Sequence, residues 1–248
     1  MQVHLTTLGC RLNEAELESW AMGFMSKGHV IAQTPEQADV VVINTCAVTQ
    51  DAVRKSRQLI RRLHRNNPTA KLVVSGCYSS LNKALSDEIE GIDLIIPNHE
   101  KENLVELTVH QLNMLAMPSE ATVPDETSLF KRGRQRAFIK IQDGCRYRCT
   151  YCIVTIARGN ERSRPIKDII SEINHLTSQG IHEAVLTGVH VGGYGSEINC
   201  DLYELIKAIK PRTLVKGGDY KGKKVIGEDI ADELKLVEFV DGKSSTQT

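Results

Sequence analysis

The stretch Ala137–Arg164 reads AFIKIQDGCRYRCTYCIVTIARGNERSR and carries three cysteines, Cys145, Cys149 and Cys152. Three and then two residues separate these cysteines, and a short strand pattern at 138–141 comes directly before them. A loop that leaves a strand and presents three thiolates in one tight turn can bind three irons of a cubic four-iron cluster. The fourth iron then has no protein ligand and is open to a small molecule.

An open iron of this kind can be chelated by the amino and carboxylate groups of S-adenosylmethionine. An electron passed through the cluster then cleaves the sulfonium and produces a 5′-deoxyadenosyl radical. A disulfide framework fits less well, because the chain has 7 cysteines, an odd number, and no secretory signal opens it. A zinc site normally has two separated CxxC pairs, and here only Cys149 and Cys152 form one. The spacing therefore favours a radical-generating cluster over zinc or a group of buried structural thiols.

The CxxxCxxC spacing, with the aromatic Tyr151 before the last cysteine, resembles the radical S-adenosylmethionine superfamily. The flanking sequences KIQDGC at 140–145 and ARGNERSR at 157–164 resemble the methylthiotransferases, and within them the branch that acts on threonylcarbamoyladenosine in tRNA. This resemblance implies that the three cysteines are the catalytic residues that generate the radical, and that Tyr151 lies against the adenine of the cofactor. It also implies an electron donor such as flavodoxin or ferredoxin.

The composition is typical of a soluble globular protein. The chain has 248 residues, of which 41% are hydrophobic and 25% charged, and this length suits one large domain or two ordinary ones. No apolar run approaches the ~20 residues of a membrane span, so we expect no membrane partner. Because free thiols without an export signal indicate a reducing compartment, we expect a cytoplasmic protein.

Positive charge is concentrated around the cysteine loop. The whole chain is neutral, with 31 Lys and Arg against 31 Asp and Glu, which taken alone argues against nucleic-acid binding. Between 131 and 164, however, ten basic residues stand against two acidic ones. This local excess suits a phosphate backbone, and the family resemblance implies that the nucleic acid is tRNA and not DNA. The residues predicted to contact RNA are Arg132, Arg134, Arg158, Arg162 and Arg164.

Residues 1–116 alternate strand and helix patterns, which predicts a parallel sheet covered by helices. The predicted fold class is α/β, and this domain is Rossmann-like or flavodoxin-like. It has no GxGxxG fingerprint that would indicate a dinucleotide site. The predicted strands are 3–8, 40–44, 71–75 and 93–96, and the predicted helices are 14–25, 50–66 and 101–115.

Three further cysteines, Cys10, Cys46 and Cys77, each follow a predicted strand of this domain. The carboxyl ends of parallel strands line one crevice of an open α/β sheet, so three thiols there would converge. A second cluster site is the natural inference, although a single cysteine is more often a small buried apolar residue. The sequences LGC, INTCAVT and SGC around these cysteines resemble the amino-terminal domain of the methylthiotransferases. The resemblance implies that they bind an auxiliary cluster that carries the inserted sulfur, and hence two 4Fe-4S clusters in all.

The stretch at 117–130 has prolines and few large apolar residues, and it predicts a linker between two domains. Beyond it, 131–206 is predicted to be an incomplete (β/α) barrel of the radical type. The loop TGVHVGGYG at 187–195 resembles the glycine-bearing loop that lies against S-adenosylmethionine in the family. This resemblance implies cofactor contacts at Gly188, Gly192 and Gly193. The predicted strands of this domain are 138–141 and 182–186, and the predicted helices are 166–178 and 202–209.

The resemblance to a radical enzyme stops near Lys207. The segment 207–248 resembles instead the end of the nucleotidyltransferase domain of heptose-phosphate adenylyltransferases, in KPRTLVKGGDY and VDGKSST. A whole methylthiotransferase would continue through more strand–helix units and a small β-barrel that binds tRNA. We therefore expect a truncated or fused chain with impaired activity and an unrelated, protease-sensitive tail.

The function that the family resemblance implies is methylthiolation of C2 of N6-threonylcarbamoyladenosine next to the anticodon of tRNA. One S-adenosylmethionine would methylate sulfur of the auxiliary cluster, and a second would yield the radical that activates C2. Rival substrates in the same family are isopentenyladenosine in tRNA and an aspartate of a ribosomal protein. A hypothesis of a different class is a non-catalytic iron–sulfur or RNA-binding remnant, which would form no 5′-deoxyadenosine.

Overall fold

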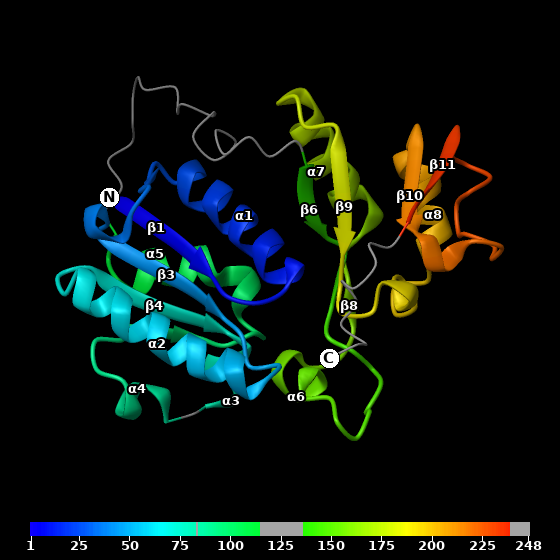
Figure 1. The fold of residues 1–248 in the computed structure, drawn as a ribbon. Helices are drawn as coiled ribbons and strands as arrows, with labels where there is room; N and C mark the ends of the chain where they lie inside the picture. Colours follow the sequence, from blue (N-terminus) through cyan, green and yellow to red (C-terminus); the bar gives the residue numbers. More distant parts are fainter. Residues whose placement is uncertain (83, 115–135, 239–248) are drawn as a thin grey trace.

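The computed structural model describes residues 1–82, 84–114 and 136–238, and these form two α/β parts that lie side by side (Figure 1). We call residues 1–114 the first part and residues 136–238 the second part. The predicted linker at 117–130 lies outside the described residues, as do Arg132 and Arg134.

Five parallel strands form the sheet of the first part. The flavodoxin-like family of folds has the strand order 2-1-3-4-5, and this sheet has the same order. The predicted fold class is therefore confirmed. The strands, in spatial order, are β2 (Val30–Ile31), β1 (Gln2–Thr7), β3 (Val40–Thr45), β4 (Lys71–Gly76) and β5 (Leu94–Ile96).

Helices cover both faces of this sheet. Successive side chains of a strand point to opposite faces, so Val42 packs beneath α1 (Arg11–Ser26) and α5 (Leu104–Gln111), whereas Ile43 packs beneath α2 (Gln50–Asn66). Because both faces are buried, β3 reads as a continuous apolar run. The remaining helices and 3-10 turns of the first part are α3 (Cys77–Leu81), α4 (Leu85–Glu88), η1 (Pro35–Gln37) and η2 (Lys101–Asn103).

The second part begins with two parallel strands and the helices that cover them. Its core includes Ile139, Ile169 and Leu205, which are fully buried. These core elements are β6 (Arg136–Lys140), α7 (Ile166–Ser178), β9 (Glu183–Thr187) and α8 (Leu202–Ile209). The shorter elements between them are β7 (Gln142–Asp143), α6 (Val154–Arg158), β8 (Arg162–Ser163) and η4 (Val191–Gly193).

Helix α1 is shared between the two parts. One side of α1 packs on the five-stranded sheet through Trp20 and Phe24, and the other side lies against β6 (Figure 1). At this second contact the Arg11 guanidinium lies 4.9 Å from the centre of the Phe138 ring. Helix α3 meets α6 elsewhere in the same interface. The interface therefore brings together the segments that carry the predicted site cysteines.

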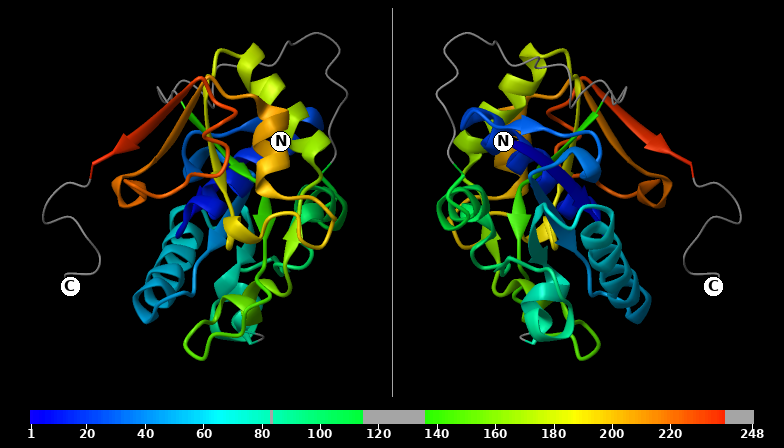
Figure 2. Two further views of the ribbon diagram at one scale, coloured as in Figure 1. Left: turned by 90° about the vertical axis from the view of Figure 1, so that its right-hand side faces the viewer. Right: turned by 90° about the vertical axis from the view of Figure 1, so that its left-hand side faces the viewer.

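The last described segment folds against the second part. Its strands β10 (Thr213–Gly217) and β11 (Glu233–Val237) pair in parallel, on the side of the molecule away from the five-stranded sheet (Figures 1 and 2). The turn η5 (Gly218–Tyr220) follows β10. Val225 is buried, and Ile230 packs on the core of the second part. The resemblance of 207–248 to the end of an adenylyltransferase domain stays a prediction. The described residues of this segment pack against α8 and do not form a separate unit.

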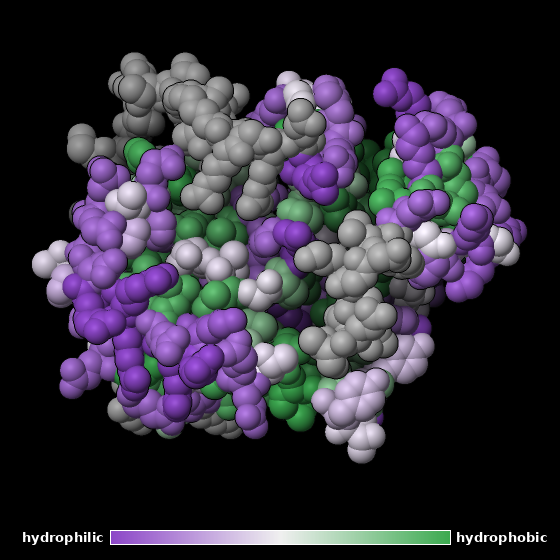
Figure 3. All heavy atoms as spheres, viewed as in Figure 1, coloured by the Kyte–Doolittle hydropathy of each residue, from purple (hydrophilic) through white to green (hydrophobic). Residues whose placement is uncertain are grey.

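One hydrophobic area is open to solvent beside these strands. It lies over α8, β10 and β11 and is surrounded by hydrophilic residues (Figure 3), and the large exposed apolar side chains there include Val215 and Val237. Among the helices of the described residues, none has the length and apolar character needed to cross a bilayer.

Candidate functional site

Cys10, Cys46 and Cys77, which we call the strand-end triad, follow three neighbouring strands at the same edge of the sheet. Cys10 lies between β1 and α1, Cys46 directly follows β3, and Cys77 directly follows β4. Strands β1, β3 and β4 are adjacent and parallel, and neighbouring strands lie about 4.8 Å apart. The sheet therefore gathers at one edge three thiols that are far apart in the sequence.

Two glycines allow the chain to turn tightly beside these cysteines. Gly9 has φ +121°, and a Cβ on it would stand 2.9 Å from the Cβ of Cys46. Gly76 has φ +108°, and a Cβ there would stand 2.2 Å from the carbonyl oxygen of Thr45. No side chain fits at either position, so both backbone turns depend on glycine.

The three thiols differ in their surroundings. Burial raises the pKa of the Cys46 thiol, and the neighbouring Cys77 and Cys10 raise it further. Cys77 is also buried, and its Sγ accepts a hydrogen bond from Asn98 Nδ2 at 3.7 Å. Cys10 is exposed and donates to Asn13 Oδ1 at 3.8 Å.

Thiolates are the ligands that iron–sulfur clusters take, so the donor type and the placement of the triad fit such a group. Among the described residues, no three His, Cys, Asp or Glu side chains are close enough together to hold a single metal ion. The auxiliary cluster therefore stays a prediction.

Cys145, Cys149 and Cys152, which we call the loop triad, lie on a loop that is closed at its base. Strands β7 and β8 pair antiparallel at that base, and the Cys145 amide donates to the Gly159 carbonyl at 3.1 Å. A Cβ on Gly144 would stand 1.9 Å from the carbonyl oxygen of Asn160, so this crossing also requires glycine.

The loop triad remains open to solvent. Within its loop the Cys152 amide donates to the Cys149 carbonyl at 3.0 Å, which forms a tight turn. Cys149 is exposed, and Cys145 and Cys152 are half-buried. Tyr151 is 92% exposed, so it makes little contact with the rest of the protein. Its predicted place against an adenine stays a prediction.

The glycine loop after β9 lies directly against the base of this cysteine loop. Gln142 joins the two, because its side chain accepts from the His190 amide at 2.9 Å and donates to the Gly144 carbonyl at 2.7 Å. A Cβ on Gly188 would stand 3.0 Å from the Gln142 side-chain oxygen. A side chain at Gly188 would therefore require Gln142 to shift by a few tenths of an ångström.

Of the two neighbouring glycines further along the glycine loop, Gly192 and Gly193, only one is crowded. A Cβ on Gly193 would stand 2.5 Å from His190 Nδ1, whereas one on Gly192 would meet nothing nearer than 3.8 Å. His190 Nδ1 is buried and has no hydrogen-bond partner among the described residues. An unpaired polar atom beside the loop triad fits a site that takes a polar cofactor.

The three predicted RNA-binding arginines that the structure describes do not share one surface. Arg164 is half-buried and pairs with Glu172 at 2.6 Å, and Arg162 donates to the Arg158 carbonyl at 3.1 Å. Arg158 is instead 4% exposed, so its guanidinium does not reach the surface in this structure.

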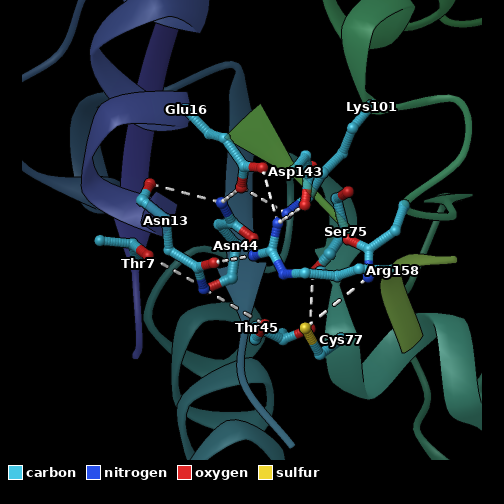
Figure 4. Close-up of polar contacts among 12 residues, drawn as sticks. Thr7, Asn13, Glu16, Asn44, Thr45, Ser75, Cys77, Lys101, Asp143 and Arg158 are labelled. Carbon is cyan, nitrogen blue, oxygen red and sulfur yellow. Dashed lines mark hydrogen bonds and ion pairs between the residues drawn. The ribbon is translucent and has the colours of Figure 1, made fainter. Parts of the chain in front are cut away.

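The Arg158 guanidinium lies within a buried group of polar side chains between the two parts (Figure 4). It donates to Asn13 Oδ1 at 2.6 Å, to Asp143 Oδ1 at 2.9 Å and to Glu16 Oε1 at 3.1 Å. Lys101 donates to the other Glu16 oxygen at 2.5 Å. We call these five residues the interface cluster. Glu16 and Lys101 were missed by sequence reasoning, since nothing in the local pattern distinguishes them from surface residues.

Electrostatics keep the Glu16 carboxylate ionised. Burial by itself would raise the pKa of Glu16, but Lys101, Arg158 and Lys140 lower it to well below its usual value. The opposite pair of effects acts on Arg158, where burial would lower the pKa and the carboxylates of Glu16 and Asp143 raise it. Glu16 and Arg158 are therefore held as an ion pair, whereas burial lowers the pKa of Lys101 and the carboxylate of Glu16 only partly offsets this.

Two family models match the chain, one on each part. The model described as uncharacterized protein family UPF0004 matches residues 2–97, and the radical SAM superfamily model matches residues 139–236. The first match contains the strand-end triad and the second contains the loop triad. The second match also includes 207–236, which the sequence analysis assigned to a separate tail.

Curated relatives match both parts together. A threonylcarbamoyladenosine tRNA methylthiotransferase MtaB of Aquifex aeolicus is 34% identical over 83% of this chain and 52% of its own length. The protein of the same name in Bacillus subtilis is 36% identical, over 77% and 44%. A tRNA-2-methylthio-N(6)-dimethylallyladenosine synthase of Thermodesulfovibrio yellowstonii is also 36% identical, over 77% and 46%. The chain thus spans about half the length of the curated relatives it matches.

A solved structure with a similar fold is among those that match the chain. It is the radical S-adenosylmethionine methyltransferase TsrM of Kitasatospora setae, determined with cobalamin and a 4Fe-4S cluster bound. It aligns with a TM-score of 0.53 at 15% identity, over 87% of this chain and 60% of that chain. At this identity the likeness shows the architecture alone.

Proposed function

Because this chain belongs to the radical S-adenosylmethionine methylthiotransferase family, we propose that it acts in the methylthiolation of an adenosine in tRNA. The observation that carries this proposal is the presence of two cysteine triads, one on each side of a single interface. A methyltransferase or a simple radical enzyme needs the loop triad alone. A second set of three thiols, placed by three adjacent strands, supports a reaction that also requires a sulfur source.

The radical SAM domain implies S-adenosylmethionine and one 4Fe-4S cluster as cofactors. The loop triad would bind this cluster, which when bound supplies the electron that cleaves S-adenosylmethionine to a radical. The chain's own residues hold the loop in place, through the Cys145 bond to Gly159 and the two bonds of Gln142. We assign the strand-end triad to a second cluster, and Gly188, Gly192 and Gly193 to the cofactor side of the loop.

Iron analysis tests the two-cluster assignment. Protein reconstituted without oxygen is expected to hold about eight irons, the sum of two four-iron clusters. With dithionite and S-adenosylmethionine it is expected to release 5′-deoxyadenosine. Full iron content without 5′-deoxyadenosine would identify a non-catalytic iron–sulfur protein, and about four irons would remove the second cluster from the proposal.

The proposed substrate is N6-threonylcarbamoyladenosine, with tRNA and an electron donor such as flavodoxin or ferredoxin as cytoplasmic partners. Relatives named for this nucleoside and for dimethylallyladenosine match at 34–36% identity, so identity alone does not separate the two substrates. The choice rests on the flanks KIQDGC and ARGNERSR. Mass spectrometry of tRNA nucleosides from a strain without the gene tests it. Loss of the 2-methylthio form of threonylcarbamoyladenosine supports the assignment, and loss of the dimethylallyl product would reassign the enzyme.

A further inference from the structure

The interface cluster is built from both parts of the chain. Asn13, Glu16 and Lys101 belong to the first part, and Asp143 and Arg158 to the second. All four charged members are at most 4% exposed, so the ion pairs are shielded from solvent (Figure 4). Residues so far apart in the sequence can meet only when the two parts are docked in one arrangement.

Stability alone is a weak explanation for these charges. Burying an ion pair costs several kcal/mol of desolvation per ion, and an apolar pair of similar size is often as stable. Buried ionic groups are better suited to fixing one geometry, because a partner that is displaced leaves an unpaired charge. The Arg158 guanidinium suits this task, since its planar fork reaches Asn13, Asp143 and Glu16 at once.

The interface cluster continues to both cysteine triads through direct polar contacts. On the first part, Asn13 accepts from Arg158 with the same oxygen that lies 3.8 Å from Cys10 Sγ. On the second part, Asp143 accepts from the Gly144 amide at 2.7 Å, directly before Cys145. Arg158 is also the residue before Gly159, whose carbonyl accepts from the Cys145 amide. One side chain thus lies between Cys10 and the base of the cysteine loop.

A second contact runs parallel to the first. The Asn98 side-chain amide lies 3.7 Å from Cys77 Sγ and donates to the Ala157 carbonyl at 2.5 Å. Ala157 is the residue before Arg158, so α6 is linked to the strand-end triad at two points, through Asn13 and through Asn98. Two links at different points resist rotation of α6 against the strand ends more than one link would.

We propose that Arg158 is a positioning residue that holds the strand-end triad and the loop triad at one fixed separation and orientation. The importance of this fixed geometry for the reaction rests on the proposed function, in which both triads serve one substrate. A misplacement of about 1 Å at reacting groups can cost about 100-fold in rate. The docking itself can be measured whether or not that function is correct.

The test compares Arg158→Met and Arg158→Lys with the control Arg54→Met, which removes an exposed arginine that pairs with Asp51 at 2.7 Å within α2. Hydrogen exchange of the protein without clusters is measured first. In Arg158→Met, amides of α3 and α6 are expected to exchange about tenfold faster or more, while the β3 and β4 amides are unchanged. Arg158→Lys keeps the charge but not the fork, and is expected to be intermediate. Exchange equal to that of Arg54→Met would overturn the proposal.

The second measurement uses reconstituted protein with matched iron content. Magnetic interaction between two reduced clusters in the electron paramagnetic resonance spectrum depends on their separation, and it is expected to weaken in Arg158→Met. Global unfolding would lower the iron content instead, so the two effects are distinguishable. If the unsubstituted protein holds one cluster, the proposed function fails while the exchange result still decides the docking role. An unchanged interaction in Arg158→Met would reject Arg158 as the positioning residue.

Discussion

Arg158 Nη1 lies 3.1 Å from Glu16 Oε1, although 142 positions separate the two residues in the chain. The contact joins α1 of the UPF0004 domain to α6 of the radical SAM domain. Together with the packing of α1 on β6, it fixes how the two domains are placed, and its side chains can be substituted one at a time.

Replacement of Glu16 by Gln is expected to lower the free energy of unfolding by about 3–5 kcal/mol, because the buried Lys101 would lose its carboxylate partner and Arg158 would keep only Asp143. Urea denaturation followed by circular dichroism measures the change. The control Glu106→Gln breaks an exposed pair with Lys27 and is expected to cost less than about 1 kcal/mol. Equal costs for both variants would show that Glu16 is not held by its buried partners.

Acidification should reduce the contribution of the same contact to the free energy of unfolding. The folded-state pKa of Glu16 lies below its usual value, so its contribution to stability is present above the unfolded pKa of about 4.3 and is lost progressively as pH falls below it. Thermal unfolding from pH 7 to pH 3 is expected to show a steeper loss in the unsubstituted protein than in Glu16→Gln. Parallel pH profiles would mean that other groups dominate acid unfolding.

Gly76→Ala is expected to destabilise the first part toward the upper end of single substitutions, about 3 kcal/mol. A methyl group there would stand 2.2 Å from the Thr45 carbonyl oxygen, and the backbone φ of +108° is unfavourable for alanine. Gly180→Ala is the matched control, because φ there is +85° and no atom lies within 4 Å of the new methyl group. Both variants carry an alanine at positive φ, so the difference between their losses in free energy of unfolding measures the steric clash at Gly76, beside Cys77.

The two triads should lose iron independently. Replacement of Cys145, Cys149 and Cys152 together by Ala is expected to leave about four irons after reconstitution, and the same change in the strand-end triad should leave the other four. Colorimetric iron analysis and circular dichroism of the apoprotein give content and fold. Loss of all iron from either variant would contradict two separate sites.

Binding of tRNA should depend steeply on salt if the basic segment contacts phosphates, since each neutralised phosphate releases counterions. Charge reversal at Arg132 and Arg134 is expected to reduce both the affinity and the slope of its salt dependence. Reversal at Arg61, an exposed residue of α2, serves as the control. A larger effect from Arg61 would place the RNA surface on the first part.

Much of this architecture follows from local sequence. The apolar runs that became β3 and β4 predicted buried parallel strands, and a cysteine directly after each predicted where the thiols would lie. The cysteine spacing at 145–152 required no tertiary information at all. Short elements such as β2 have too few residues to show the alternation of apolar and polar side chains that predicts a strand.

The interface could not be predicted in this way. Arg158 stands in a basic stretch of the sequence. The sequence shows that its side chain is positively charged, but not whether the side chain points to solvent or into the protein. Its burial depends on the docking of α6 against the first part, which brings Glu16 and Asn13 to it. The folding of 207–238 against α8 was also missed, since the resemblance used for that segment contained no information on what it packs against.

The shared position of α1 also implies an order of events during translation. Glu16 and Lys101 can pair once the first domain has emerged from the ribosome, because both belong to it. Helix α6, which meets α3 beside Cys77, is made only later. Amino-terminal domains generally fold first during synthesis. The nascent chain therefore passes through a stage in which the sheet edge at Cys77 is folded but not yet covered by α6.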